Sequence, residues 1–84
     1  MNYAVEILRS AGKQLAAIDR QDQPRIFAAI RALASNPRPP GCKKLTGRPA
    51  WRIRVGVYRV IYEIHDNRLL VLVVVVGHRR EVYR

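Results

Sequence analysis

The sequence of 84 residues lacks several features that would place it in a common protein class. Its single cysteine, Cys42, allows no disulfide within the chain, and one cysteine with two histidines is too few for a structural zinc site. The longest apolar run, Leu69 to Val76, is much shorter than the roughly 20 residues of a membrane-spanning helix. The start of the chain carries Glu6 and shows no signal-peptide pattern. We therefore expect a cytoplasmic protein that needs no membrane, metal or cofactor.

Acidic residues are also scarce, because 16 Lys and Arg face only six Asp and Glu, for a net charge of +10. Residues 1–42 carry six basic and three acidic residues, whereas residues 43–84 carry ten and three. Most of the basic residues are arginines, whose planar guanidinium pairs with phosphate through two parallel hydrogen bonds. The bias predicts a polyanionic partner, of which nucleic acid is the first candidate. An anionic membrane, an acidic protein or a merely solubilising surface also fits it.

The first half of the sequence predicts a short strand and a pair of helices. Residues 2–8 alternate as in a strand. Two apolar stripes at helical spacing follow, with Ser10 and Asp22 as expected caps and Pro24 tolerated in the second helix's first turn. The stripes consist of Leu8, Ala11, Leu15 and Ile18, and of Ile26, Ala29, Ile30 and Leu33. Asn36 and Pro37 end the second helix, and residues 36–41 form a stiff, proline-rich connector.

From Trp51 onward apolar residues recur at every second position, which predicts antiparallel strands. If Gly56 and Val57 form a two-residue hairpin loop, Arg54 lies opposite Arg59, on the same face as Arg52. Like charges in such positions destabilise a sheet, so their coexistence favours an anion bound between them. Three arginines that simply point into water are the alternative.

A second turn is expected at Asp66-Asn67, followed by a central strand over Leu69–Val76 that is buried on both faces. With this loop, His65 lies opposite Arg68 and Arg59 opposite Val74. Val76 and His78 then continue on the face of the arginines. We therefore expect His78 close to Arg54 and Arg59.

Four stretches together carry a resemblance to a known family. They are Lys43-Lys44-Leu45, residues 51–56 (WRIRVG), residues 58–64 (YRVIYEI) and residues 76–83 (VGHRREVY). The chain resembles the RelE/ParE toxin superfamily, and within it the RelE-type messenger-RNA endonucleases of type II toxin–antitoxin systems. The resemblance implies one α+β domain over residues 1–84. Its parts are an N-terminal strand, a helical hairpin, a mostly antiparallel sheet of about four strands with both helices on one face, and a basic C-terminal tail.

The resemblance also implies a reaction and partners. The ribose 2′-OH attacks the adjacent phosphate of messenger RNA in the ribosomal decoding site, without a metal or cofactor. A cognate acidic antitoxin neutralises the toxin. Arg59 and Arg79 match phosphate-stabilising arginines, and Tyr83 matches a tyrosine that stacks on or orients the nucleotide. Contacts to messenger or ribosomal RNA are expected from Lys43, Lys44, Arg48 and Arg80.

The sequence departs from the family pattern at Arg52 and Arg54, which occupy positions where relatives carry lysines, one of them a proposed general base. A guanidinium cannot accept a proton near neutral pH. Our hypothesis is that His78 takes the proton, because an unperturbed histidine titrates near 6.5 and surrounding arginines favour its neutral form. The alternative is that His78 only contacts RNA or ends the strand.

Two other functions stay open at this stage. The first is a ParE-like toxin that acts on DNA gyrase, which would share the fold. The second is a non-enzymatic binder, such as a basic adaptor or a decayed toxin that binds only its antitoxin. The presence of Arg59, Arg79 and Tyr83 argues against decay.

Overall fold

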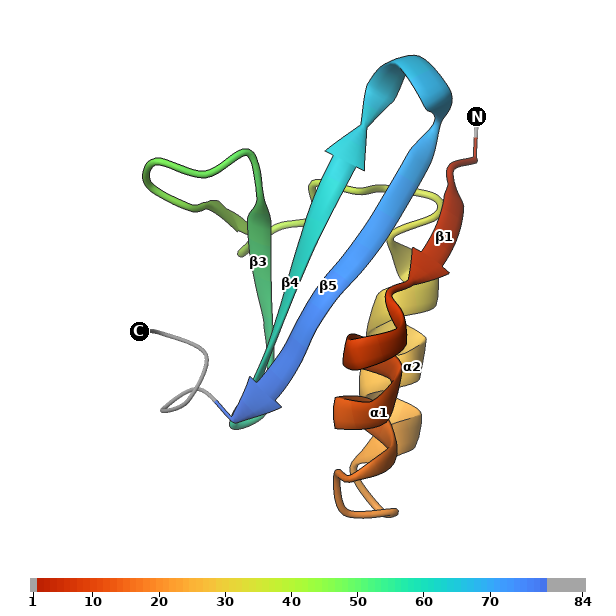
Figure 1. Ribbon diagram of the computed structural model, residues 1–84, viewed down its shortest axis with the longest axis vertical. Coiled ribbons are helices and arrows are strands. Elements are labelled where there is room, and N and C mark those ends of the chain that lie inside the picture. The colour runs from red at the N-terminus through yellow and green to blue at the C-terminus, as the bar shows by residue number, and fades with distance from the viewer. Residues whose placement is uncertain (1, 79–84) are drawn as a thin grey trace.

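The computed structural model describes residues 2–78 as a helical hairpin packed on one mixed sheet (Figure 1). The elements in chain order are β1 (Ala4–Ile7), α1 (Arg9–Ala16), α2 (Gln23–Ala32), β2 (Lys43–Lys44), β3 (Trp51–Val55), β4 (Tyr58–His65), the 3₁₀ turn η1 (Asp66–Arg68) and β5 (Leu70–His78). Within the described residues, neither helix is long and apolar enough to cross a membrane.

The sheet has five strands in the order β1-β5-β4-β3-β2. All neighbouring strands are antiparallel except β1 and β5, which pair in parallel, with Val5 opposite Val71. The helical hairpin between β1 and the rest of the sheet provides the long connection that a parallel pair needs. The predicted α+β fold is confirmed, with one short edge strand, β2, beyond the four that were expected.

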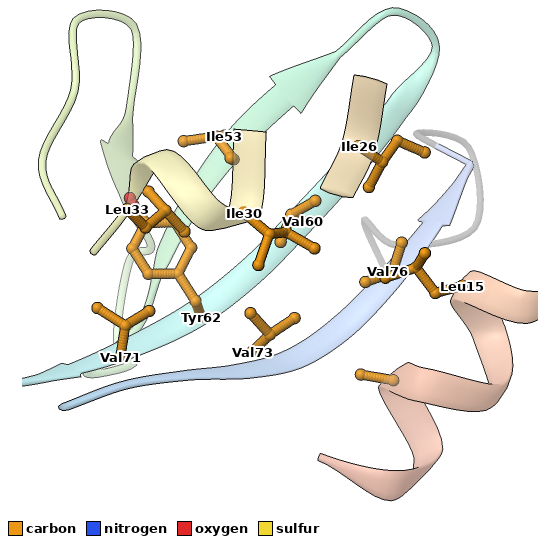
Figure 2. Close-up of a cluster of buried hydrophobic side chains, with 11 residues drawn as sticks. Leu15, Ile26, Ile30, Leu33, Ile53, Val60, Tyr62, Val71, Val73 and Val76 are labelled. Carbon is orange, nitrogen blue, oxygen red and sulfur yellow. The ribbon is translucent and has the colours of Figure 1, made fainter. Parts of the chain in front are cut away.

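One hydrophobic core fills the space between the two helices and the sheet (Figure 2). The largest fully buried side chains from the helices and the turn after α2 are Leu15, Ile26, Ile30 and Leu33, and those from the strands include Val60, Tyr62, Val71, Val73 and Val76. Each aliphatic side chain buried in this way contributes about 1.5–3 kcal/mol to folding. The apolar residues of the helical stripes and of the alternating strands therefore pack in the same core. Their pattern determines which face of the sheet the helices cover.

The first helix begins at a different residue from the one expected, and the second begins as expected but without the expected side-chain cap. Helix α1 begins at Arg9 with Leu8 as its capping residue, so Ser10 lies inside the first turn and the predicted Ser10 cap is wrong. Asp22 does precede α2, and Pro24 is tolerated in its first turn, as predicted. The Asp22 side chain, however, makes no capping hydrogen bond and is used elsewhere.

The turn between β3 and β4 is the predicted two-residue hairpin loop. Val55 pairs with Tyr58 and Arg54 with Arg59, as expected from a loop of Gly56 and Val57. Gly56 has a φ of 60°, which is the positive value that a type II′ turn requires at its first loop residue. The register between β3 and β4 was therefore predictable from the loop length alone.

The predicted register between β4 and β5 is wrong. The turn extends over four residues, the 3₁₀ turn Asp66–Arg68 and Leu69, so that His65 pairs with Leu70. Leu69 adopts the left-handed conformation with φ 49° and ψ 49°, which is uncommon for a residue with a side chain. A register shift between Ile61 and Tyr62 then moves the partner of Arg59 to Gly77.

A polar cluster fixes the end of the sheet farthest from the β3–β4 hairpin. Asp66 accepts hydrogen bonds from the Tyr3 hydroxyl and from Arg38 Nη2, the latter at 2.9 Å. The Arg38 guanidinium also lies over the Trp51 ring, 5.1 Å from its centroid. The proline-rich connector is held from a second side by the buried Tyr62, whose hydroxyl donates to Pro37 O at 2.7 Å. These contacts join the start of the chain, the connector and the β4–β5 turn.

Candidate nucleic-acid interface

The sheet face opposite the helices carries the basic residues of the hairpin strands. Alternation along β3 and β4 sends Ile53 and Val60 into the core, so Arg52, Arg54 and Arg59 fall on the other side. Lys43 joins them, because it is the register partner of Arg52 on the edge strand β2. We call these four residues, Lys43, Arg52, Arg54 and Arg59, the arginine face. Its three arginines lie where the sequence predicts them.

The arginines differ strongly in exposure. Arg52 and Arg59 are only 3% and 6% exposed, whereas Arg54 is open to solvent. Withdrawing a guanidinium from water carries a cost that hydrogen bonds or opposite charge must offset. The positive charges of Arg52 and Arg59 are thus held at fixed positions inside the fold. Arg54 lies directly opposite Arg59 on the neighbouring strand.

A hollow of about 330 Å³ opens beside the arginine face. Lys43, Arg52 and Arg54 line it from the strands, and Pro40 and Gly41 of the connector line it from the other side. Gly41 has a φ of 89°, a conformation that glycine adopts without strain. The hollow gathers three cationic side chains around one space, which is an arrangement suited to a phosphate group.

The tip of the β3–β4 hairpin is fixed by the start of α2. Asp22 accepts a hydrogen bond from Arg25 Nη2 at 3.0 Å and another from the Tyr58 hydroxyl at 3.3 Å. The Arg25 guanidinium also lies close to Gly56, 3.2 Å from the position where a Cβ would stand. Burial and the negative charge of Asp22 raise the pKa of Tyr58. Asp22 therefore helps to hold the hairpin that carries Arg54 and Arg59. Sequence reasoning missed this role, because an aspartate before a helix indicates only a cap.

The expected position of His78 is wrong. His78 pairs with Tyr58, which lies on the helix side of the sheet, and the two rings meet edge to face with centroids 6.2 Å apart. Val76, also expected on the face of the arginines, is buried in the core. The cause is the longer β4–β5 turn together with the register shift at Ile61 and Tyr62, which brings Gly77 rather than Val74 opposite Arg59.

The other predicted RNA contacts do not form one group. Lys44 pairs with Trp51 and so lies on the opposite side of β2 from Lys43. Arg48 is exposed in the loop between β2 and β3. Arg79, Arg80 and Tyr83 lie outside the residues that the structure describes. Within residues 2–78, the arginine face is the place where the predicted site residues gather.

Comparison with known proteins identifies the family. The family model described as the ParE toxin of type II toxin–antitoxin system, parDE, matches residues 5–83. The chain belongs to this toxin family. An Escherichia coli protein described as a RelE-like toxin is 27% identical over 81 residues, which are 94% of this chain and 85% of that protein. The resemblance read from the sequence is thereby confirmed at the level of the RelE/ParE superfamily.

Solved toxin structures share the fold over almost the whole chain. The archaeal RelE–RelB complex from Pyrococcus horikoshii contains a chain 25% identical to this one, with a TM-score of 0.84 and coverage of 96% of this chain and 99% of that chain. A mutant of E. coli RelE in the free state is 23% identical, with a TM-score of 0.82 and coverage of 99% and 88%. The chain therefore combines membership of a type II toxin–antitoxin toxin family with a fold like that of RelE.

Proposed function

We propose that this toxin is a metal-independent endoribonuclease that cleaves messenger RNA in the ribosomal decoding site. The observation that carries the proposal is the cross-strand pair Arg54 and Arg59, on one face with Arg52 and beside a cationic hollow. Folding alone disfavours like charges in directly opposed positions. A phosphodiester held between the guanidinium groups would turn this repulsion into attraction.

The chemistry of the proposed reaction needs charge stabilisation above all. The 2′-OH oxygen attacks phosphorus, the bond to the 5′-oxygen breaks, and the products are a 2′,3′-cyclic phosphate and a free 5′-OH. Negative charge grows on the equatorial oxygens of the phosphorane, and donors that are already in place stabilise it without reorganisation. Arg52 and Arg59 suit this role because their burial restricts their movement.

The proton transfers need another group, because a guanidinium cannot act as a base near neutral pH. We propose that His78 accepts the 2′-OH proton from RNA that crosses the end of β5, since His78 lies on the helix side of the sheet, opposite the arginine face. His78 is the last residue of that strand, and Gly77, next to it, is the register partner of Arg59. Wild-type cleavage rates for His78→Ala would remove His78 from the mechanism. The implied roles of Arg79 and Tyr83 stay predictions.

The test is cleavage of a defined message by the purified toxin on programmed ribosomes. We expect cuts within the codon in the decoding site, dependent on the ribosome. Arg54→Ala should lower the rate about 10²-fold or more, as loss of one transition-state donor does. Arg20→Ala is the matched control, because Arg20 is an exposed arginine in the loop between the helices. Equal rates for both variants would refute the assigned role of the arginine face.

The family model gives a specific reason to keep a second candidate, because it is named for ParE. A toxin that acts on DNA gyrase could use the same basic face to approach DNA. Parallel incubations with gyrase and plasmid, and with programmed ribosomes, distinguish the two. Cleaved gyrase–DNA complexes with intact message would replace the nuclease proposal.

The proposed partners follow from charge and from the relatives. We propose a cognate acidic antitoxin, because a chain with a net charge of +10 needs a partner of opposite sign to mask it. RelE–RelB complexes are known among the structural relatives. The proposed location is the cytoplasm, where ribosomes and the antitoxin are available.

A further inference from the structure

A second cavity lies on the helix side of the sheet, away from the cationic hollow. Its volume is about 540 Å³, within the range typical of small-ligand sites. The end of α1 and the residues after it line one wall, and the ends of β4 and β5 line the other. The lining residues are Gln14, Ala17, Ile18, Asp19, Tyr58, Val75, Val76, Gly77 and His78. The chemistry assigned above leaves this cavity, apart from His78, without a role.

The strand wall of the cavity offers aromatic surface. Tyr58 and His78 meet at an interplanar angle of 75°, so their rings form a corner rather than a closed stack. Ile18 and Val76 add apolar surface. A flat ring that enters the corner can lie against one aromatic face and touch the edge of the other. Proteins that bind single-stranded RNA take up unstacked bases on such surfaces.

The polar groups of the cavity present one acceptor and one donor. Gln14 Oε1 accepts the backbone N–H of Val76 at 2.8 Å, which leaves the amide hydrogens of Gln14 for a ligand. Asp19 supplies a carboxylate, whose charge contributes to the raised pKa of Tyr58 after burial and Asp22. The Watson–Crick edge of guanine has the complementary order, with an acceptor at O6 and donors at N1 and N2. Guanine thus offers three groups complementary to these two side chains, and the other bases offer fewer.

The position of the cavity relative to the arginine face completes the argument. Tyr58 and Arg59 are consecutive residues of β4, and they pair with the consecutive residues His78 and Gly77 of β5. Successive strand residues point to opposite faces, so the aromatic corner and the arginines lie back to back at one end of the sheet. RNA that passes around this end of the sheet could therefore contact both faces.

We propose that this cavity binds a guanine base of the substrate RNA, through stacking on Tyr58 and His78 and pairing with Asp19 and Gln14, at the same end of the sheet as Arg54 and Arg59. This assignment rests on the proposed function in its choice of RNA as the ligand. It adds a preference for guanine, and it places the ribose at the rim of the sheet beside His78.

Titration of the full chain with guanosine and inosine 5′-monophosphates, followed by backbone amide chemical shifts, tests the assignment. The two ligands carry the same phosphate and differ only in the N2 amino group. We expect guanosine monophosphate to bind about tenfold more tightly than inosine monophosphate, the value of one good base contact. Asp19→Asn should abolish this difference. Glu6→Gln, which makes the same charge change on the edge strand β1, should preserve it.

A second variant tests the stacking surface. Tyr58→Leu should lower the affinity for both monophosphates by about tenfold, because a leucine does not stack on a base. The ratio of the two affinities should stay unchanged. Equal binding of the two ligands to the wild-type chain would overturn the proposal. Shifts confined to the arginine face would also overturn it, as would an unchanged preference in Asp19→Asn. Absence of binding by either monophosphate would likewise overturn it.

The outcomes separate the cavity from the enzyme activity. Guanine-selective binding without cleavage on programmed ribosomes would support the guanine site and refute the proposed nuclease activity. Cleavage by Asp19→Asn at the wild-type rate, with the wild-type preference among codons, would support the nuclease activity and refute the guanine site.

Discussion

Replacement of Arg54 by glutamine should stabilise the fold while it weakens anion binding. Arg54 and Arg59 are direct register partners on adjacent antiparallel strands. Like charges in such positions cost about 0.2–1 kcal/mol, and the exposure of Arg54 favours the lower half of that range. Arg54→Gln should therefore raise the free energy of unfolding by about 0.5 kcal/mol, which corresponds to an increase of about 2–4 °C in Tm for a chain of this size.

Inorganic phosphate should reverse this order of stabilities. A ligand that binds only the folded state stabilises it by RT ln(1 + [L]/Kd), which is about 1.4 kcal/mol at ten times Kd. If the anion lies between the guanidinium groups of Arg54 and Arg59, the wild-type chain gains this free energy and Arg54→Gln gains much less. With phosphate the wild-type chain should thus become the more stable of the two.

The assay is thermal unfolding, followed by circular dichroism, in buffers of low ionic strength with and without phosphate. Arg20→Gln is the control for the loss of one positive charge outside the arginine face. At about 1 M sodium chloride the Debye length falls to roughly 3 Å, so the difference without phosphate should shrink. A lower Tm for Arg54→Gln in the absence of phosphate, or an equal gain from phosphate in all three chains, would refute the reasoning.

Three further predictions concern the parts of the fold that position this face. Asp66→Asn should lower Tm at neutral pH and flatten its dependence on pH in an acid titration. The hydrogen bonds from Arg38 and Tyr3 hold the pKa of Asp66 below its usual range. The ionised Asp66 carboxylate therefore stabilises the fold fully above about pH 4, and this stabilisation is lost as pH falls through the lower folded pKa. Equal pH profiles of Tm for the wild-type chain and Asp66→Asn would contradict this. Gly56→Ala should cost about 1–2 kcal/mol in urea unfolding, because its φ of 60° disfavours a side chain, and an unchanged midpoint would show that the turn relaxes freely. Tyr62→Phe should cost about 1 kcal/mol through loss of its buried hydrogen bond to Pro37 O, whereas no loss would mean that the connector needs no such anchor.

The features that the sequence predicts well are those determined by local rules. Alternation and a two-residue loop are enough to place Arg54 opposite Arg59, because the pairing depends only on residues 51–62 and on the glycine at position 56. The helical stripes likewise predict the buried faces of α1 and α2. The family resemblance adds the order of the elements, but the parallel pairing of β1 with β5 was not predicted.

The register of β5 was not predictable in the same way. Asp66-Asn67 resembles a tight hairpin loop, but the chain makes a 3₁₀ turn and places Leu69 in the left-handed region, where glycine or asparagine would be the expected signal. The irregularity at Ile61 and Tyr62 leaves no mark in an alternating apolar run. Each feature shifts the pairing, and together they place His78 on the helix side.

The positions of the three arginines on one face of the sheet were predictable, and the cavity on the helix side was not. Arginines near a glycine turn are visible in a sequence, because their charge and spacing are unusual. The cavity joins Gln14 of α1 and Asp19 of the following loop to Tyr58 and His78 of the sheet. No local pattern connects these residues, since their proximity depends on how α1 packs on β5.

The most direct test of the central claim is a double-mutant cycle on the single-turnover rate of message cleavage. Arg54→Gln, Arg59→Gln and the double variant are compared with the wild-type chain, and circular dichroism verifies that each is folded. If both guanidinium groups hold one scissile phosphate, each single variant loses about 10²-fold or more, and the double variant loses far less than the product of the two losses. Losses that multiply as for independent sites, or single variants that cleave at the wild-type rate, would contradict the account.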